Sequence, residues 1–315
     1  MKTRFRRPHR FAALGVLAAA GATAAHAQDA AAPNAAMRFL SAGAQADARH
    51  NQALQGTLSL PVGERGWVQL GGGQTRSEQD AVSHRPGVFT AGAGFIGTGW
   101  QAALNAAHRA DGQAFRQTDG SLTLDWQAER FNLGLDGSLR DARQQGTVSA
   151  PDGQGGTATV PVVQTVRGGG LGLHGGVRLG ANANVHAGFM RYHYQVLTQQ
   201  NGASSGSGGL ISGLLGNRTL LARALSTRES AVNRDEAALS RSVQIGATYR
   251  FEQVALTADY TGDHVLDTPG TVHTVLLKAA LTLGPRWTLV PALGRTRSAS
   301  FGGVNFGALS ASVAW

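Results

Sequence analysis

Apolar residues alternate one by one with small or polar residues over several long stretches of this chain. In SVQIGATYRF (residues 242–251), every second position is apolar: Val, Ile, Ala, Tyr and Phe. The stretches NLGLDGSLR (132–140) and TVHTVLLKAALTL (271–283) show the same alternation. A period of two is that of a β-strand whose two faces meet different environments. We therefore expect a protein built from two-faced strands.

The length of these stretches distinguishes two architectures that share the pattern. A soluble sandwich places its apolar faces inside, whereas a membrane barrel places them outside. The alternating runs here extend over about ten to thirteen residues, while strands of soluble proteins average roughly five or six. About ten residues suit a strand that crosses a bilayer at a tilt. Run length therefore favours the membrane barrel.

The connections between the runs predict the strand count. Six short connections and seven longer ones give fourteen strands, with twelve and sixteen as alternatives. The expected fold is an all-β transmembrane antiparallel up-and-down β-barrel over residues 37–315, with short periplasmic turns and longer extracellular loops. The longer loops are expected near residues 46–52, 76–86, 109–115, 144–163, 198–238, 262–271 and 296–302.

The longest expected loop, residues 198–238, combines a Gly/Ser-rich lead with leucines at roughly helical spacing and nearby arginines. Such a segment could fold into the barrel mouth as a constriction, or it could lie on the rim as a surface loop. The residues of the candidate constriction are Leu210, Leu214, Arg218, Leu221, Arg223 and Leu225.

The beginning of the chain has the layout of a secretory signal peptide. A basic head precedes an apolar run from Phe11 to Ala20 and the small-residue site Ala25-His26-Ala27. The run is shorter than the roughly 20 residues of a membrane-spanning helix, so we expect cleavage near Ala27. Residues 1–27 are the expected signal peptide and 28–36 a short periplasmic linker.

Export changes the charge of the mature chain. Five of the 28 Lys and Arg residues, and none of the 19 acidic ones, lie in the first 27 residues, so the net charge falls from +9 to +4. A nucleic-acid partner needs a basic face with base-stacking aromatic residues, and an exported chain rarely meets one. No nucleic-acid partner is expected.

The tryptophans gather beside the short connections. Barrels carry aromatic girdles where the wall meets the lipid headgroups, because an indole is apolar in body but has an N–H to satisfy. The alternative is that they are scattered core anchors. The expected girdle residues are Trp67, Trp100, Trp126, Trp287 and Trp315.

The last eight residues, ALSASVAW (308–315), alternate and stop on a tryptophan. A barrel must pair its last strand with its first, because an open edge cannot be left in hydrocarbon. This segment resembles the carboxy-terminal signal of bacterial outer-membrane barrels, with Trp in place of the commoner Phe and with Gly307 and Ala311 small for the pattern. The mature chain resembles the outer-membrane β-barrel superfamily of porin-like and channel-type barrels, and no specific family is indicated.

This resemblance implies a location and a set of partners. The location is the outer membrane of a Gram-negative bacterium. The partners are outer-membrane lipids, lipopolysaccharide and the barrel assembly machinery, which would recognise the C-terminal strand.

Charged residues share the polar face of the predicted strands. If the apolar face meets lipid, they point inward, where charges of both signs can line a wet pore or pair across a filled interior. Fourteen strands enclose more space than the eight-stranded barrels that side chains can fill, which favours the pore. The expected lumen-lining residues are Asp125, Asp136, Arg140, His174, Arg178, Arg250, Asp259 and Lys278.

The sequence indicates no catalytic, metal or cofactor site. None of the mature chain's histidines precedes a serine by two positions, which leaves open only a dyad formed between strands. Acidic residues in the expected loops, including Asp119 and Asp263, lack the spacing of a calcium loop. The Gly170, Gly172 and Gly175 motif continues as a strand with no helix after it, unlike a dinucleotide site.

The expected function is passage across the outer membrane. The chain would be either a passive channel for small hydrophilic solutes or an exit conduit for a secreted polymer. Conduits of this kind are often joined to a helical periplasmic scaffold, and any such scaffold would be a separate protein here, since residues 28–36 leave no room for one. The alternative is a non-transporting barrel with a filled lumen that displays loops for adhesion or recognition, and an outer-membrane lipid hydrolase is less favoured.

Overall fold

The computed structural model describes residues 38–48, 51–79, 82–112, 115–151, 157–200, 239–265, 270–299 and 302–315. These residues form fifteen strands. They are β1 (Phe39–Asp47), β2 (Gln52–Val62), β3 (Gly66–Gln79), β4 (Val82–His84), β5 (Gly87–Ile96), β6 (Trp100–Asp111), β7 (Phe115–Gln127), β8 (Phe131–Pro151), β9 (Thr157–Leu179), β10 (Ala183–Gln200), β11 (Leu239–Arg250), β12 (Val254–Val265), β13 (Thr271–Thr282), β14 (Trp287–Ser298) and β15 (Gly302–Ala314).

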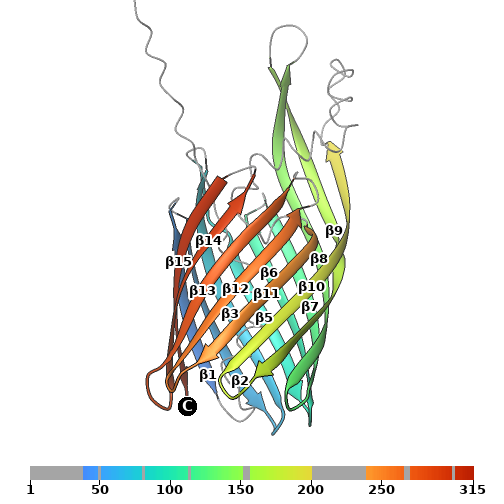
Figure 1. Cartoon of the computed structure of the whole chain (residues 1–315). Helices are drawn as coiled ribbons and strands as arrows, with labels where there is room; N and C mark the ends of the chain where they lie inside the picture. Colours follow the sequence, from blue (N-terminus) through green and yellow to red (C-terminus); the bar gives the residue numbers. More distant parts are fainter. Residues whose placement is uncertain are drawn as a thin grey trace, which may run out of the picture.

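The strands close into an antiparallel barrel (Figure 1). Consecutive strands pair around the wall, and β1 pairs with both β2 and β15. The three-residue β4 pairs only with the loop end of β3, so the wall itself has fourteen strands. The predicted fold and strand count are confirmed. Among the described residues, no helix is long and apolar enough to cross a membrane.

The C-terminal strand closes the barrel as expected. Its register with β1 runs from Phe39 opposite Ala314 to Asp47 opposite Phe306. The Trp315 N–H then donates to the Arg38 carbonyl at 3.1 Å. The first and last strands therefore leave no open seam between them, which strands facing lipid require.

Six turns of three or four residues gather at one end of the barrel, beside the C-terminus (Figure 1). Glycines with positive φ lie in several of them, such as Gly63 (φ 65°) and Gly180 (φ 79°). This left-handed backbone is open to glycine without steric cost. These turns lie where the sequence predicted the short connections.

The opposite end corrects three predicted loops. The expected loop 76–86 contains the end of β3 and all of β4. The expected loop 109–115 shrinks to residues 112–114, because β6 and β7 continue further than their apolar alternation. The expected loop 144–163 is mostly strand, since β8 and β9 stay paired up to Pro151 opposite Thr157. This hairpin extends beyond its neighbours (Figure 1). Backbone pairing there needs no apolar face, so the sequence carried no alternation to reveal it.

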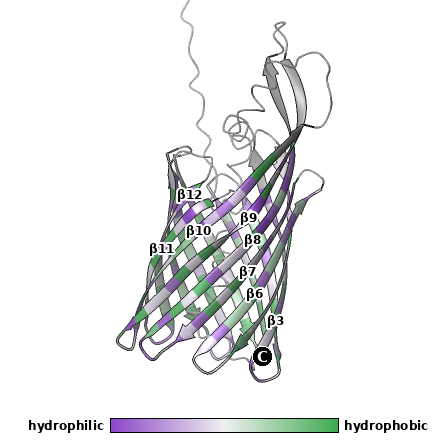
Figure 2. Ribbon diagram, turned by 90° about the vertical axis from the view of Figure 1, so that its right-hand side faces the viewer, coloured by the Kyte–Doolittle hydropathy of each residue, from purple (hydrophilic) through white to green (hydrophobic). Residues whose placement is uncertain are grey.

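The outer face of the wall is apolar. On β8, the outward side chains of Leu133, Leu135 and Leu139 are 54%, 56% and 72% exposed, while Asp136 and Arg140 point to the other side. Hydrophobic and hydrophilic residues alternate along the strands in this way around the barrel (Figure 2). Such a surface is unfavourable in water and suits contact with lipid.

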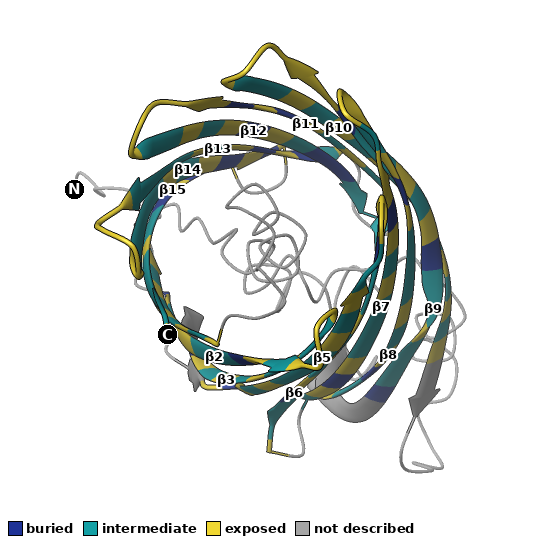
Figure 3. Ribbon diagram, turned by 90° about the horizontal axis from the view of Figure 1, so that it is seen from below, coloured by how far each residue is buried: buried dark blue, intermediate teal, exposed yellow. Residues whose placement is uncertain are grey.

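The described strands form a closed ring (Figure 3), and their own side chains build no conventional hydrophobic core. Among the described residues, the buried hydrophobic side chains are few: Ala142, Val163, Val272, Val304 and Phe306. Buried polar side chains outnumber them. The described wall is therefore held together by backbone pairing and by polar contacts on its inner face.

Candidate functional site: the inner wall of the barrel

A central cluster of five polar side chains crosses the inner face of β6, β7, β8 and β9. His174 Nε2 lies 2.5 Å from Asp125 Oδ1, and His174 Nδ1 lies 2.6 Å from Asp136 Oδ2. Gln101 donates to Asp125 at 2.9 Å, and Thr123 donates to Asp136 at 3.0 Å. Because ionised carboxylates only accept, both imidazole contacts are hydrogen bonds when both ring nitrogens carry protons. Three of the predicted lumen residues thus form one network.

A glycine makes this network possible. Gly134 on β8 lies between β7 and β9, and a Cβ placed on it would overlap the His174 imidazole and approach Asp125 Oδ1 to 2.6 Å. The missing side chain lets His174 lie across β8 and reach a carboxylate two strands away. The glycine is therefore a slot for a neighbour's side chain.

The second group, the lysine cluster, repeats this arrangement on the next part of the wall. His186 Nε2 on β10 lies 2.9 Å from Asp259 Oδ1 on β12, across Gly246 on β11. Lys278 Nζ on β13 lies 2.9 Å from Asp259 Oδ2. Asp259 is 5% exposed, so the Lys278 ammonium compensates the charge of a buried carboxylate and the His186 imidazole adds a second contact. The structure brings the predicted Asp259 and Lys278 together and adds His186.

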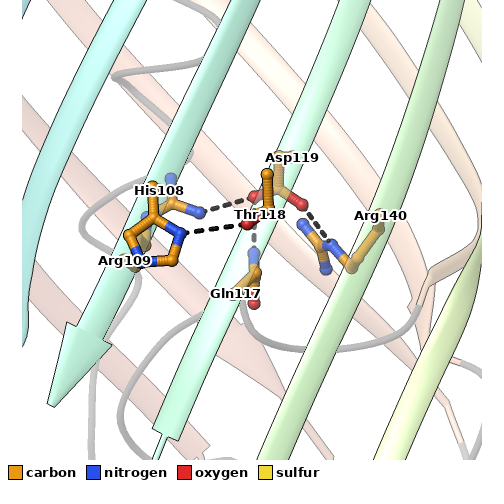
Figure 4. Close-up of polar contacts among 6 residues, drawn as sticks. All are labelled: His108, Arg109, Gln117, Thr118, Asp119 and Arg140. Carbon is orange, nitrogen blue, oxygen red and sulfur yellow. Dashed lines mark hydrogen bonds and ion pairs between the residues drawn. The ribbon is translucent and has the colours of Figure 1, made fainter. Parts of the chain in front are cut away.

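The third group, the arginine cluster, lies nearer the loop end (Figure 4). Arg109 Nη1 and Arg140 Nε each lie 2.7 Å from an oxygen of Asp119, and Gln117 donates to Asp119 at 2.5 Å. This cluster carries two positive charges for one negative charge. Sequence reasoning missed Arg109 and placed Asp119 in a loop. That placement is wrong, because β7 begins at Phe115 and sets Asp119 on its inner face.

Asp263 is a second correction of the same kind. It was expected in a loop, but it lies on β12, is 2% exposed and accepts a hydrogen bond from Ser242 Oγ at 2.5 Å. The alternation of apolar residues fades near the loop end, so the inner polar residues of that region resemble loop residues in the sequence.

The outer face of β6 and β7 carries a hydroxyl–imidazole contact. His108 Nδ1 lies 3.0 Å from Thr118 Oγ1, and both side chains are exposed (Figure 4). The neighbouring carboxylate, Asp141, lies 3.1 Å from Arg167 Nε. With that carboxylate engaged by an arginine, the geometry does not make a carboxylate–imidazole–hydroxyl triad.

The remaining predicted lumen residues lie at the turn end. Arg178 is exposed, and its Nη1 lies 3.5 Å from the Glu129 carbonyl oxygen. Arg250 lines an open hollow of about 630 Å³ beside Asn182 and the turn that follows β11. These arginines therefore lie at the rim, apart from the three clusters on the wall.

Four tryptophans point outward at the turn end. Trp100, Trp126, Trp287 and Trp315 are 47%, 52%, 54% and 49% exposed, and Trp100 lies opposite Trp126 in the register. Trp67 corrects the prediction for that residue. Its indole lies over Gly94 on the inner face of the wall.

Aromatic side chains also cover inward glycines elsewhere. The rings of Tyr192 and Tyr194 on β10 lie over Gly170 and Gly168 on β9. The two rings are parallel within 11°, and their centroids are 5.9 Å apart. Long side chains thus lie along the wall, and the ion pairs described above each join strands no more than two apart.

Some predicted residues lie outside the described part of the chain. These are the signal peptide, the linker 28–36 and the candidate constriction residues of 198–238, namely Leu210, Leu214, Arg218, Leu221, Arg223 and Leu225. Within the described ranges, no group of three or more His, Asp or Glu residues could hold a metal ion.

No family model matches the chain, and no curated protein matches it. Solved structures do. The CymD monoaromatic hydrocarbon channel is 9% identical, with a TM-score of 0.50 over 88% of this chain and 87% of that one. The TodX deltaS2S3 mutant monoaromatic hydrocarbon channel is 11% identical, with a TM-score of 0.50 over 90% of each chain. The chain therefore has the fold of the outer-membrane β-barrels.

Proposed function

We propose that this chain spans the outer membrane of a Gram-negative bacterium as a passive channel for small hydrophilic solutes. The observation that carries the proposal is the arrangement of charge on the inner wall. Acidic and basic side chains pair with neighbours along the wall, and some of them lie over inward glycines. These side chains therefore do not project toward the axis of the barrel.

The membrane setting has support from three features. The outward leucines are highly exposed, the last strand closes the sheet, and the N-terminal segment reads as a signal peptide. A barrel with so much exposed apolar surface would be unstable in water.

The lining indicates the class of solute. The three clusters combine carboxylates, imidazoles, an ammonium group and guanidinium groups, so charges of both signs face the lumen. Paired opposite charges produce a weak net field, which gives little preference between anions and cations. Small polar solutes fit such a wall. The two channels named above are described as passing monoaromatic hydrocarbons, a chemistry that this charged inner face does not favour.

Planar-bilayer recording of the refolded mature chain tests the proposal. Discrete conductance steps are expected, with a reversal potential close to zero in a potassium chloride gradient. Swelling of proteoliposomes in neutral sugars should show uptake that falls with sugar size. A barrel that passes neither ions nor sugars would overturn the proposal.

A variant that lacks residues 201–238 separates the alternatives. Steps that occur in the full chain support the channel. Steps that occur only after the deletion would indicate a plugged barrel that displays its loops. Conductance without uptake of small sugars, together with block by an added polysaccharide, would favour an exit conduit for a polymer.

A further inference from the structure

A basic hollow of about 370 Å³ lies on the outer face of the barrel, across β10, β11 and β12. Its lining residues are Phe189, Arg191, Ser240, Arg241 and His264. Phe189 and Arg191 alternate with inward Met190 and Tyr192, so the hollow opens to the outside of the wall. None of these residues belongs to the inner-wall clusters.

The charges around the hollow are poorly compensated by the protein. Arg191 lies directly opposite Arg241 in the β10–β11 register, and both are exposed. Like charges directly opposite on one face of a sheet destabilise the strand pair. No described acidic residue forms an ion pair with either arginine.

A histidine adds a third polar group. His264 on β12 lies opposite Arg241 in the β11–β12 register, on the same outer face of the sheet. Its Nδ1 is buried without a hydrogen-bond partner. Two guanidinium groups and an imidazole therefore converge on one hollow that offers donors for an anion. An anion held between the arginines would remove their repulsion and use their donors.

The height of the hollow on the wall indicates where that anion comes from. Phe189 and Val243 lie directly opposite each other, one outward position closer to the turn end, and are 49% and 37% exposed. Beyond them the outer face is apolar, with Leu173 and Ile245 each more than half exposed. The hollow thus lies at the border of the apolar face that is nearer the loop end. A lipid phosphate would lie at this border, with its acyl chains extending toward the turn end.

We propose that this hollow binds the phosphate of a phosphorylated lipid in the outer leaflet. The guanidinium groups of Arg191 and Arg241 hold the phosphate oxygens by charge-assisted hydrogen bonds, and the acyl chains run along Phe189 and Val243. The inference rests on the proposed membrane setting, but it does not depend on the barrel being an open channel.

The test uses the full mature chain in phosphatidylcholine nanodiscs, with and without a minor fraction of phosphatidic acid. Native mass spectrometry counts retained phosphatidic acid in the wild type, in R191Q/R241Q and in the control R295Q/R297Q. The control removes two other outward arginines from β14, which do not line the hollow. We expect about tenfold weaker retention in R191Q/R241Q and little change in the control.

Two results would overturn the proposal. Equal loss in both double variants would show general attraction to a basic surface. Displacement of the lipid by inorganic phosphate at similar concentration would show a site for the free anion. Planar-bilayer conductance, measured on the same variants, keeps the two proposals apart, because R191Q/R241Q should conduct as the wild type does even where lipid retention is lost.

Discussion

Replacing His174 with leucine should destabilise the barrel, because it removes the link between two inward carboxylates. The Asp125 side chain is 2% exposed, and it would lose its 2.5 Å contact with the imidazole while keeping the hydrogen bond from Gln101. Breaking a buried charge pair from one side costs about 3–5 kcal/mol. The His174 and Asp136 side chains are 25% and 27% exposed, so water reduces the cost to about 2–3 kcal/mol.

Equilibrium unfolding in urea, of protein folded in lipid vesicles, measures this cost through tryptophan fluorescence. H193L is the matched control, because His193 lies on the outer face of β10 and is exposed. The control should change the free energy of unfolding by no more than about 0.5 kcal/mol. A loss in H174L no larger than that in H193L would contradict a role for the imidazole in stability.

A double-mutant cycle with D125N tests the reason for the loss. Once the carboxylate is a neutral amide, no buried charge remains to be compensated at that position, so adding H174L should cost less than it does in the wild type. Costs that add to within about 0.5 kcal/mol would refute the coupling between His174 and Asp125.

Three further changes test other parts of the wall. G246V should lower the urea midpoint, because its Cβ would overlap His186 and Asp259. The outward G137V should leave the midpoint unchanged, because its Cβ would make only ordinary contacts at 3.9 and 4.0 Å. F306A should cost about 3 kcal/mol in the same assay, since a ring packed over an inward glycine leaves a cavity. R140Q removes one positive charge from the lumen and should shift the reversal potential toward cation preference; no shift would place Arg140 away from the permeation path.

The barrel could be predicted because its outer face meets a nearly uniform solvent. Each outward residue needs only to be apolar, so the alternation is visible without knowing any partner strand. The stretch NLGLDGSLR shows this: its leucines are outward in β8, as the pattern predicted. Where the strands rise beyond the apolar face, as in residues 144–163, that constraint ends and the prediction fails with it.

The sequence around Trp67 contains an alternation that predicts the correct face of the wall, but the girdle interpretation was based on the nearby turn instead. In WVQLGGG, Val68 and Leu70 form the apolar set, so Trp67 shares its face with Gln69 and Gly71. The alternation therefore places it inward. The girdle interpretation used proximity to the turn, which fixes height on the wall but says nothing about the face.

The inner clusters could not be read in the same way, because their chemistry depends on register. Asp125 and His174 are 49 residues apart, and His186 and Asp259 are 73 apart. The two residues of each pair are too far apart in the sequence for their spacing to predict the contact. Knowing that all four point inward does not say which of them meet, since a shift of one strand by two residues keeps the faces and changes every partner.

Glycine carries the other half of that information. At Gly134 and Gly246, the absent side chain determines that a histidine from the next strand can lie flat and reach a carboxylate two strands away. A polar residue on an inner wall would otherwise project into the lumen to find a partner. The glycine and the long polar residue therefore act as a pair, and neither residue alone predicts the contact. Because the pair keeps its charges along the wall, the same arrangement that stabilises the sheet keeps these side chains away from the axis of the barrel.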